Sequence, residues 1–213
     1  MDRQKLDKWN RWVEQIETDM INLLSTRQIY KGYGEIVVAN AEIQAAGATF
    51  HSFVVDGYVT QISMAVRRQL DTDPDTISLA HLITEIKDNP GTITRADYVA
   101  RYANMPMGVG RAIGDRHFTE LAGPGQIFDP AIAQTDLDTL KEASRKLKSL
   151  ADRKIAHRSK QPSPKMTFDE VDECIEAIKK LAQKYITLLT GGHHELEPVL
   201  LEWQEVFTKK WIA

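Results

Sequence analysis

The sequence predicts an all-α protein built as a helical bundle. Along much of the chain, apolar residues recur at steps of three and four residues, which is the period of one helix face. No segment alternates apolar and polar residues for long enough to predict a sheet, and no unit repeats at a period of about 20 to 50 residues. A chain of 213 residues is within the usual size of one domain. We therefore expect a single domain over 1–213, with a core bundle over 1–190 and a linker and helix over 191–213.

The N-terminal third is predicted to form two helices. The first carries one apolar face, made by Trp9, Trp12, Val13, Ile16, Met20, Leu23 and Leu24. Gly32 and Gly34 are expected to end this helix. The second extends over 36–70, where apolar and alanine residues are frequent and charges are few. We expect it to be the most buried helix of the protein, with a kink near Gly47 or Gly57.

The middle of the chain is predicted to hold short helices. Residues 71–75 are typical of a turn, after which Ser78 or Thr76 caps a short apolar helix. Thr94 begins another in a pattern like a capping box. Glycines and prolines are concentrated over 105–130, so we expect short helical turns and loops there.

Two longer helices are predicted in the C-terminal third. One begins at Thr135 and runs to about His157, because the proline-containing loop 159–165 must stop it. The other begins at the capping box formed by Thr167 and Glu170. Glycines at 191 and 192 close that helix, and a final helix is expected from about Pro198.

Composition excludes several classes of protein. The net charge of -3 gives no overall field that would attract polyanions. A single cysteine, Cys174, excludes an internal disulfide and a multi-cysteine zinc site, and we interpret it as a small buried residue in a cytoplasmic protein. No apolar stretch is long enough to span a membrane, so no membrane contact is expected. Phosphate-loop, dinucleotide and metalloprotease motifs are missing, and we expect no cofactor.

Two regions rich in polar side chains remain as candidate sites. His193 and His194 lie close to Glu197, but adjacent residues in a linker rarely converge on a metal, so we expect none there. The other region is basic and contains two acids, Glu142 and Asp152. Its cations are Lys141, Arg145, Lys146, Lys148, Arg153, Lys154, Arg158, Lys160 and Lys165. On spacing alone, this pattern favours a solvated helix face followed by a loop.

Within the basic region, Arg153 and His157 are four residues apart and share one helix face. A permanent cation then lies beside a group that titrates near neutral pH. Such a pair suits phosphodiester chemistry: His157 takes a proton from a ribose 2'-hydroxyl, while Arg153 or Arg158 binds the phosphate oxygens. The alternative is structural, since arginine and histidine at a helix end also satisfy its last carbonyl groups.

The same segment carries a family resemblance. Residues 150–158, with the sequence LADRKIAHR, are followed by the proline loop and by TFDEV at 167–171. This arrangement resembles the C-terminal half of HEPN-type helical proteins, in particular their abortive-infection branch. The segments VRRQL at 66–70, SLAHLI at 78–83 and Asn89-Pro90 fit the same branch.

The resemblance implies a HEPN-like bundle that forms a homodimer, with two Arg-His motifs in one cleft. It also implies a metal-independent RNA endonuclease, acting in phage defence or as a toxin with an antitoxin partner. The family motif separates an arginine from the histidine by four to six residues. Here Asp152 occupies the position five before His157 and the nearest arginine, Arg153, is one residue too close, so Arg153, Arg158, Arg67 or Arg68 would have to replace that arginine.

The site expected from these arguments has two parts. His157, Arg153, Arg158 and Asp152 form the expected catalytic group, and Arg67, Arg68, Lys154 and Lys160 are expected to contact nucleic acid. The alternative is an inactive helical interaction module, whose dimer binds a protein, a nucleotide or nucleic acid. In that case Asp152 and His157 hold helices together.

Overall fold

The computed structural model describes residues 2–103, 109–156, 160, 164–192 and 195–210. The longer α-helices are α1 (Arg3–Ala39), α3 (Ala48–Gln69), α4 (Leu79–Asp88), α6 (Gly110–Ala122), α7 (Pro130–Leu150) and α8 (Phe168–Thr190). The shorter elements are α2 (Ala41–Ala45), η1 (Pro90–Thr92), α5 (Arg95–Ala100), the π-helix η3 (Ala151–Ala156) and the 3-10 helix η4 (Trp203–Thr208). These residues contain no strand, and an isolated bridge joins Thr94 to Ile127. The predicted all-α class is confirmed.

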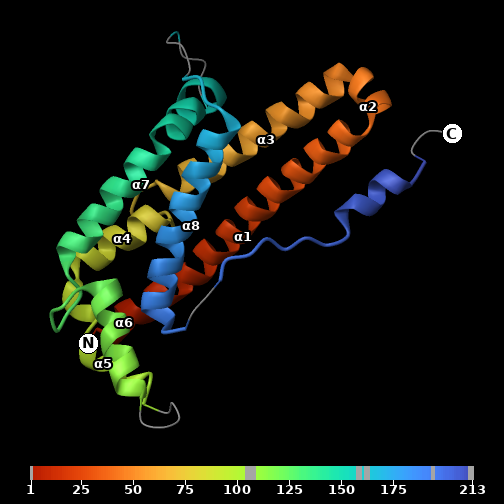
Figure 1. Ribbon diagram of the computed structural model, residues 1–213. Coiled ribbons are helices and arrows are strands. Elements are labelled where there is room, and N and C mark those ends of the chain that lie inside the picture. Colours follow the sequence, from red (N-terminus) through yellow and green to blue (C-terminus); the bar gives the residue numbers. More distant parts are fainter. Residues whose placement is uncertain (1, 104–108, 157–159, 161–163, 193–194, 211–213) are drawn as a thin grey trace.

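Four helices make the core of the bundle. α1 packs against α8 and α3, and α7 also packs against α3 and α8 (Figure 1). α4 covers another side of α7. The centre is apolar and closed to solvent, with Trp9, Ile62, Ile178 and Tyr185 all at 0 % exposure. Cys174 is also buried, and burial raises the pKa of its thiol to about 11, which confirms its interpretation as a small core residue.

The first helix is longer than predicted. α1 continues through Gly32 and Gly34 and ends at Ala39, so the expected break was wrong. Gly32 is buried because the Trp203 ring packs against it, and a Cβ at this position would lie 2.7 Å from Cζ2 of that ring. The glycine therefore provides room for a neighbour that a local pattern cannot reveal. The chain turns later, through Asn40, whose side chain caps α2, and Gly47, whose φ of 73° is left-handed.

The second predicted helix is not the most buried one. No residue of 33–57 is buried, and the buried residues of α3 are Tyr58, Ile62, Ser63, Val66 and Gln69. The end of α1, α2 and the first half of α3 project from the bundle as two helices joined by a tight turn (Figure 1, orange). Residues 33–57 are called the hairpin below. Its apolar sequence predicted burial. In the described residues η4 approaches the hairpin, with the Phe207 ring 6.5 Å from that of Tyr33, but most hairpin residues remain exposed.

The short helices α4 and α5 begin at the capping residues that the sequence predicted. Ser78 accepts a hydrogen bond from the His81 amide at the start of α4, and Thr94 accepts one from the Asp97 amide at the start of α5, so both predicted helix starts are confirmed. Over 105–130, where short helical turns and loops were expected, α6 is instead a regular helix of 13 residues. Its Gly114 packs against α5, where a Cβ would lie 2.9 Å from the Tyr102 ring.

The last long helices are confirmed with changed ends. α7 begins at Pro130, five residues before the predicted start at Thr135, and Asp129 caps it. The capping box of Thr167 and Glu170 begins α8 as predicted. After α8 the chain crosses α1 as an irregular segment, with the Val199 amide donating to Ser25 Oγ at 2.9 Å. The expected final helix is therefore replaced by this segment and the 3-10 helix η4.

Arg95 ties α5 to the loop that follows α6. It is 9 % exposed, and its Nε donates to the Gly125 carbonyl at 2.8 Å while Nη2 donates to the Gly123 carbonyl at 2.8 Å. Its Nη1 reaches Asp115 Oδ1 at 2.8 Å and Thr119 Oγ1 at 2.9 Å. A guanidinium can serve all these acceptors because its donors form a planar fork.

We predict that Arg95→Met lowers the free energy of unfolding by about 3 kcal/mol, because the buried Gly123 carbonyl loses its charged donor and the hydrogen bonds to Gly125, Asp115 and Thr119 are lost with it. Urea unfolding followed by circular dichroism measures the change. Arg116→Met is the control, since the Arg116 side chain is 74 % exposed and lies 3.9 Å from Glu120. Equal stability losses in the two variants would contradict the role assigned to Arg95.

Candidate functional site

The candidate site lies where α7 ends. Its last turn passes into the π-helix η3, which carries Asp152 and Arg153 and leads directly to His157. π-helical turns inside α-helices are frequent at functional sites, because they change the direction in which side chains point. α3 packs against η3, and this contact brings residues of α3 to the segment that precedes His157 in the sequence.

Asp152 is held by two cations from different helices. Arg67 Nε on α3 donates to Asp152 Oδ1 at 2.7 Å, and Lys148 Nζ on α7 donates to Oδ2 at 2.6 Å. The Asp152 side chain is 33 % exposed, so the pair lies at the surface. The hydrogen bond from Lys148, followed by that from Arg67, lowers the pKa of the Asp152 carboxyl although partial burial opposes the change. Asp152 is therefore an ionised anchor for Arg67.

The structure brings some of the expected residues together and separates others. Arg67, Asp152 and Arg153 lie around η3. Arg67 comes from the end of the second predicted helix, which was one of the expected sources of a replacement arginine. The backbone of Lys154 lies in η3, and Lys160 is exposed. His157 and Arg158 lie outside the described residues.

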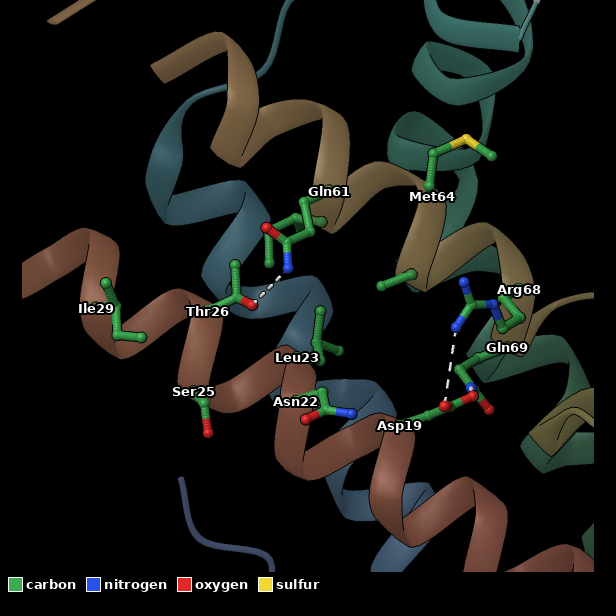
Figure 2. A pocket seen from close by; sticks show the side chains of 12 residues that line it. Asp19, Asn22, Leu23, Ser25, Thr26, Ile29, Gln61, Met64, Arg68 and Gln69 are labelled. Atoms are coloured by element: carbon green, nitrogen blue, oxygen red, sulfur yellow. Dashed lines mark hydrogen bonds and ion pairs between the residues drawn. The ribbon is translucent and has the colours of Figure 1, made fainter. Parts of the chain in front are cut away.

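Arg68 does not join this group. It lines a groove of about 430 Å³ between α1 and α3, where Nη1 lies 3.8 Å from Asp19 Oδ1 (Figure 2). Asp19 also accepts a hydrogen bond from the buried Gln69 amide at 3.1 Å, and Gln61 crosses the groove to Thr26 at 3.0 Å. Arg67 and Arg68 are adjacent in sequence, so their side chains leave α3 in different directions. Arg67 and Arg68 therefore belong to different surfaces, and the expected contact of each with nucleic acid stays a prediction.

Lys148 was not among the expected site residues. Its position four residues before Asp152 is the spacing of an ion pair on one helix face, which is the signal that could have identified it. Together with Arg153 and the α7 residues Lys141 and Arg145, it lines a shallow groove of about 580 Å³. The same groove contains acids, and Glu142 lies 3.2 Å from Arg145. Its charge is therefore mixed.

Other kinds of site find little support in the described part of the chain. Glu197 lies 3.4 Å from Lys179, while His193 and His194 lie outside the described residues. No three His, Cys, Asp or Glu side chains are grouped closely enough to hold a metal ion, as far as the described residues show. Within the same residues, no helix is both long enough and apolar enough to cross a membrane.

A model of the HEPN_AbiU2 family, described as AbiU2, matches residues 6–205. The chain belongs to the HEPN_AbiU2 family. This match confirms the resemblance and places the protein in an abortive-infection family, which serves in phage defence. No curated protein and no solved structure matches the chain.

The match covers the bundle as well as the segment that crosses α1. In this HEPN_AbiU2 protein, the position five before His157 is occupied by an aspartate that binds Arg67, an arginine 85 residues earlier in the chain. A guanidinium thus lies close to the segment that precedes the histidine, although it comes from α3.

We predict that Asp152→Asn lowers the free energy of unfolding by about 0.5–1 kcal/mol at neutral pH, because its two surface ion pairs, with Arg67 and Lys148, are lost. Pairing lowers the pKa of Asp152 in the folded state, so its contribution is complete above the unfolded value near pH 4 and disappears as the pH falls through the lowered pKa. Urea unfolding between pH 7 and pH 3 tests this. Asp138→Asn, on the same face of α7, is the control, and a pH-independent difference for Asp152→Asn would refute the assignment.

Proposed function

We propose that the protein is a metal-independent RNA endonuclease of phage defence, with His157 as its general acid or base. The observation that carries the proposal is the 2.7 Å contact between Arg67 and Asp152, next to η3. It supplies an arginine close to the position where the family motif has one. Arg153 lies on η3, which ends one residue before His157 in the sequence, and Arg67 lies on α3, which packs against η3.

In the proposed reaction, His157 takes the proton from a ribose 2'-hydroxyl, whose oxygen attacks the adjacent phosphorus. The bond to the 5'-oxygen breaks, that oxygen takes a proton from water, and the other product is a 2',3'-cyclic phosphate. His157 then returns its proton to solvent. Negative charge increases on the phosphate oxygens during the attack. Arg67 and Arg153 stabilise that charge, since a guanidinium donates two parallel hydrogen bonds to such oxygens. Asp152 positions Arg67 and takes no part in the proton transfer.

A second function is favoured by the same contact. An aspartate that joins α3 to η3 also suits an inactive member of the family, in which the fold serves to bind a protein, a nucleotide or nucleic acid. In that case the ion pair stabilises the bundle, and His157→Ala changes the melting temperature without changing any activity. The two functions differ in what His157 does, so that residue is the one to substitute.

We predict that the purified protein cleaves labelled RNA in the presence of EDTA and that His157→Ala lowers the rate by about 100-fold or more, because a general acid or base contributes at least that factor. Arg67→Ala lowers the rate by about 100-fold through lost charge stabilisation. Arg116→Ala, an exposed arginine on α6, leaves the rate unchanged. Single-turnover cleavage on denaturing gels measures all three.

The substrate provides the control for mechanism. An oligonucleotide of the same sequence with 2'-deoxyribose at the cleaved position lacks the attacking oxygen and stays intact. Cleavage of that oligonucleotide, a requirement for a divalent metal, or full activity of His157→Ala would each disprove the proposal. If the wild-type protein leaves RNA intact and His157→Ala shifts only the melting temperature, the interaction module replaces it.

A further inference from the structure

A row of cations follows one side of α7, which lies at an edge of the bundle (Figure 1). Lys141, Arg145 and Lys148 are spaced by four and three residues, so they project from the helix within about 60° of one another. All three are exposed and line the groove of about 580 Å³ on α7. Lys148 also bonds Asp152 at 2.6 Å. The row therefore runs along α7 toward η3 and the Asp152 site.

Acids flank the row on one side. Asp138 and Glu142 also line the groove, and Glu142 Oε1 lies 3.2 Å from Arg145 Nη2. The side chains of Arg145 and Glu142 are 67 % and 73 % exposed, so their ion pair is weak and another anion can replace Glu142. Lys141 makes no ion pair with another residue of the described part of the chain. The cationic strip is therefore narrow, with room for one line of negative charges.

The spacing of the row suits the backbone of one nucleic-acid strand. It places one cation per helical turn of about 5.4 Å, which is similar to the distance between neighbouring phosphates of a strand. Arg67 extends the row by a further turn, because Asp152 holds it beside η3 at 2.7 Å. From Lys141 to Asp152 the helix rises about 17 Å. Several successive phosphates can therefore be contacted at once.

The groove offers nothing that would distinguish one base from another. Its described lining consists of lysines, arginines, acids and Ser149. Among these residues there is no aromatic ring on which a base could stack and no asparagine or glutamine that could read an adenine edge. Binding in this groove therefore depends on the backbone and tolerates many sequences.

We propose that the row on α7 binds the phosphates of a single-stranded RNA segment next to the cleaved bond. The proposal rests on the proposed endonuclease and names the form of RNA that it accepts. A duplex would bring its second strand toward Asp138 and Glu142, whose negative charges repel phosphates. Because the whole chain has a net charge of -3, attraction of a polyanion has to come from a local row of this kind.

Fluorescence anisotropy with a labelled single-stranded 2'-O-methyl RNA tests the row without cleavage, because this RNA lacks the attacking hydroxyl. At about 50 mM salt, Lys141→Gln and Arg145→Gln are each expected to weaken binding by about 5-fold. The double variant lowers the slope of log K against log salt by about 1.4, since each lost phosphate contact contributes roughly 0.7. Both substitutions leave Arg67, Lys148 and Asp152 in place, so the candidate catalytic site stays intact.

Glu142→Gln should have the opposite effect and tighten binding by about 3-fold, because it removes a repelling charge and frees Arg145. Arg116→Gln is the matched control, because Arg116 is 74 % exposed and forms a similar surface pair with Glu120 at 3.9 Å. Circular dichroism melts confirm that each variant folds. A duplex of the same length and chemistry is expected to bind more weakly than the single strand.

The outcomes separate this proposal from the endonuclease. A double variant that binds like the wild type would overturn it, as would an equal loss in Arg116→Gln or a duplex that binds as tightly as the single strand. If RNA is cut by a protein whose binding ignores the row, the endonuclease stands and the strand-binding row is wrong. If the row governs binding and no RNA is cut, the endonuclease fails and the row is the strand-binding site of an inactive module.

Discussion

The unequal lengths of the packed helices determine most of what this molecule presents to solvent. α1 has 37 residues and spans about 55 Å, whereas α8, which packs along it, has 23 residues and spans about 34 Å. Beyond the start of α8, where Phe168 packs against Tyr30 and Tyr58, α1 and α3 continue together, and η4 approaches them with Phe207 6.5 Å from Tyr33. Apolar side chains in the shared length close the core, and apolar side chains beyond it are left exposed. The segment after α8 covers part of α1, because Trp203 packs against Gly32. Part of the surface of α1 that α8 does not reach is therefore covered by this segment.

The junction between α7 and η3 depends on a second constraint, which is electrostatic. Asp152 is close enough to Lys148 and Arg67 for both ion pairs to form, but all three side chains remain partly exposed, so the pairs add little stability. Their value is geometric, because they fix an arginine from α3 against the segment that leads to His157. A substitution that is neutral for stability can still move that guanidinium. Stability and the proposed chemistry are thus separable at this junction.

Local signals were sufficient for the starts of α4, α5 and α8 but not for the surfaces. Ser78, Thr94 and Thr167 could be recognised from sequence because a cap bonds within three residues of itself. Gly32 and Gly114 could not, since each makes room for an aromatic ring from another element. Hydrophobicity correctly identified 36–57 as apolar, but it does not say which partner covers it. The contact of Arg67 with Asp152 joins residues 85 apart, and only the packing of α3 on η3 brings them together.

α3 connects the hairpin to the Asp152 site. Its first half belongs to the hairpin, its last turn holds Arg67, and between them Tyr58, Ile62 and Val66 fix the helix in the core. A closely packed core resists displacement, so these buried residues hold the end of α3 in place whatever covers the hairpin. The position of Arg67 beside η3 is therefore determined by the core and by its ion pair with Asp152.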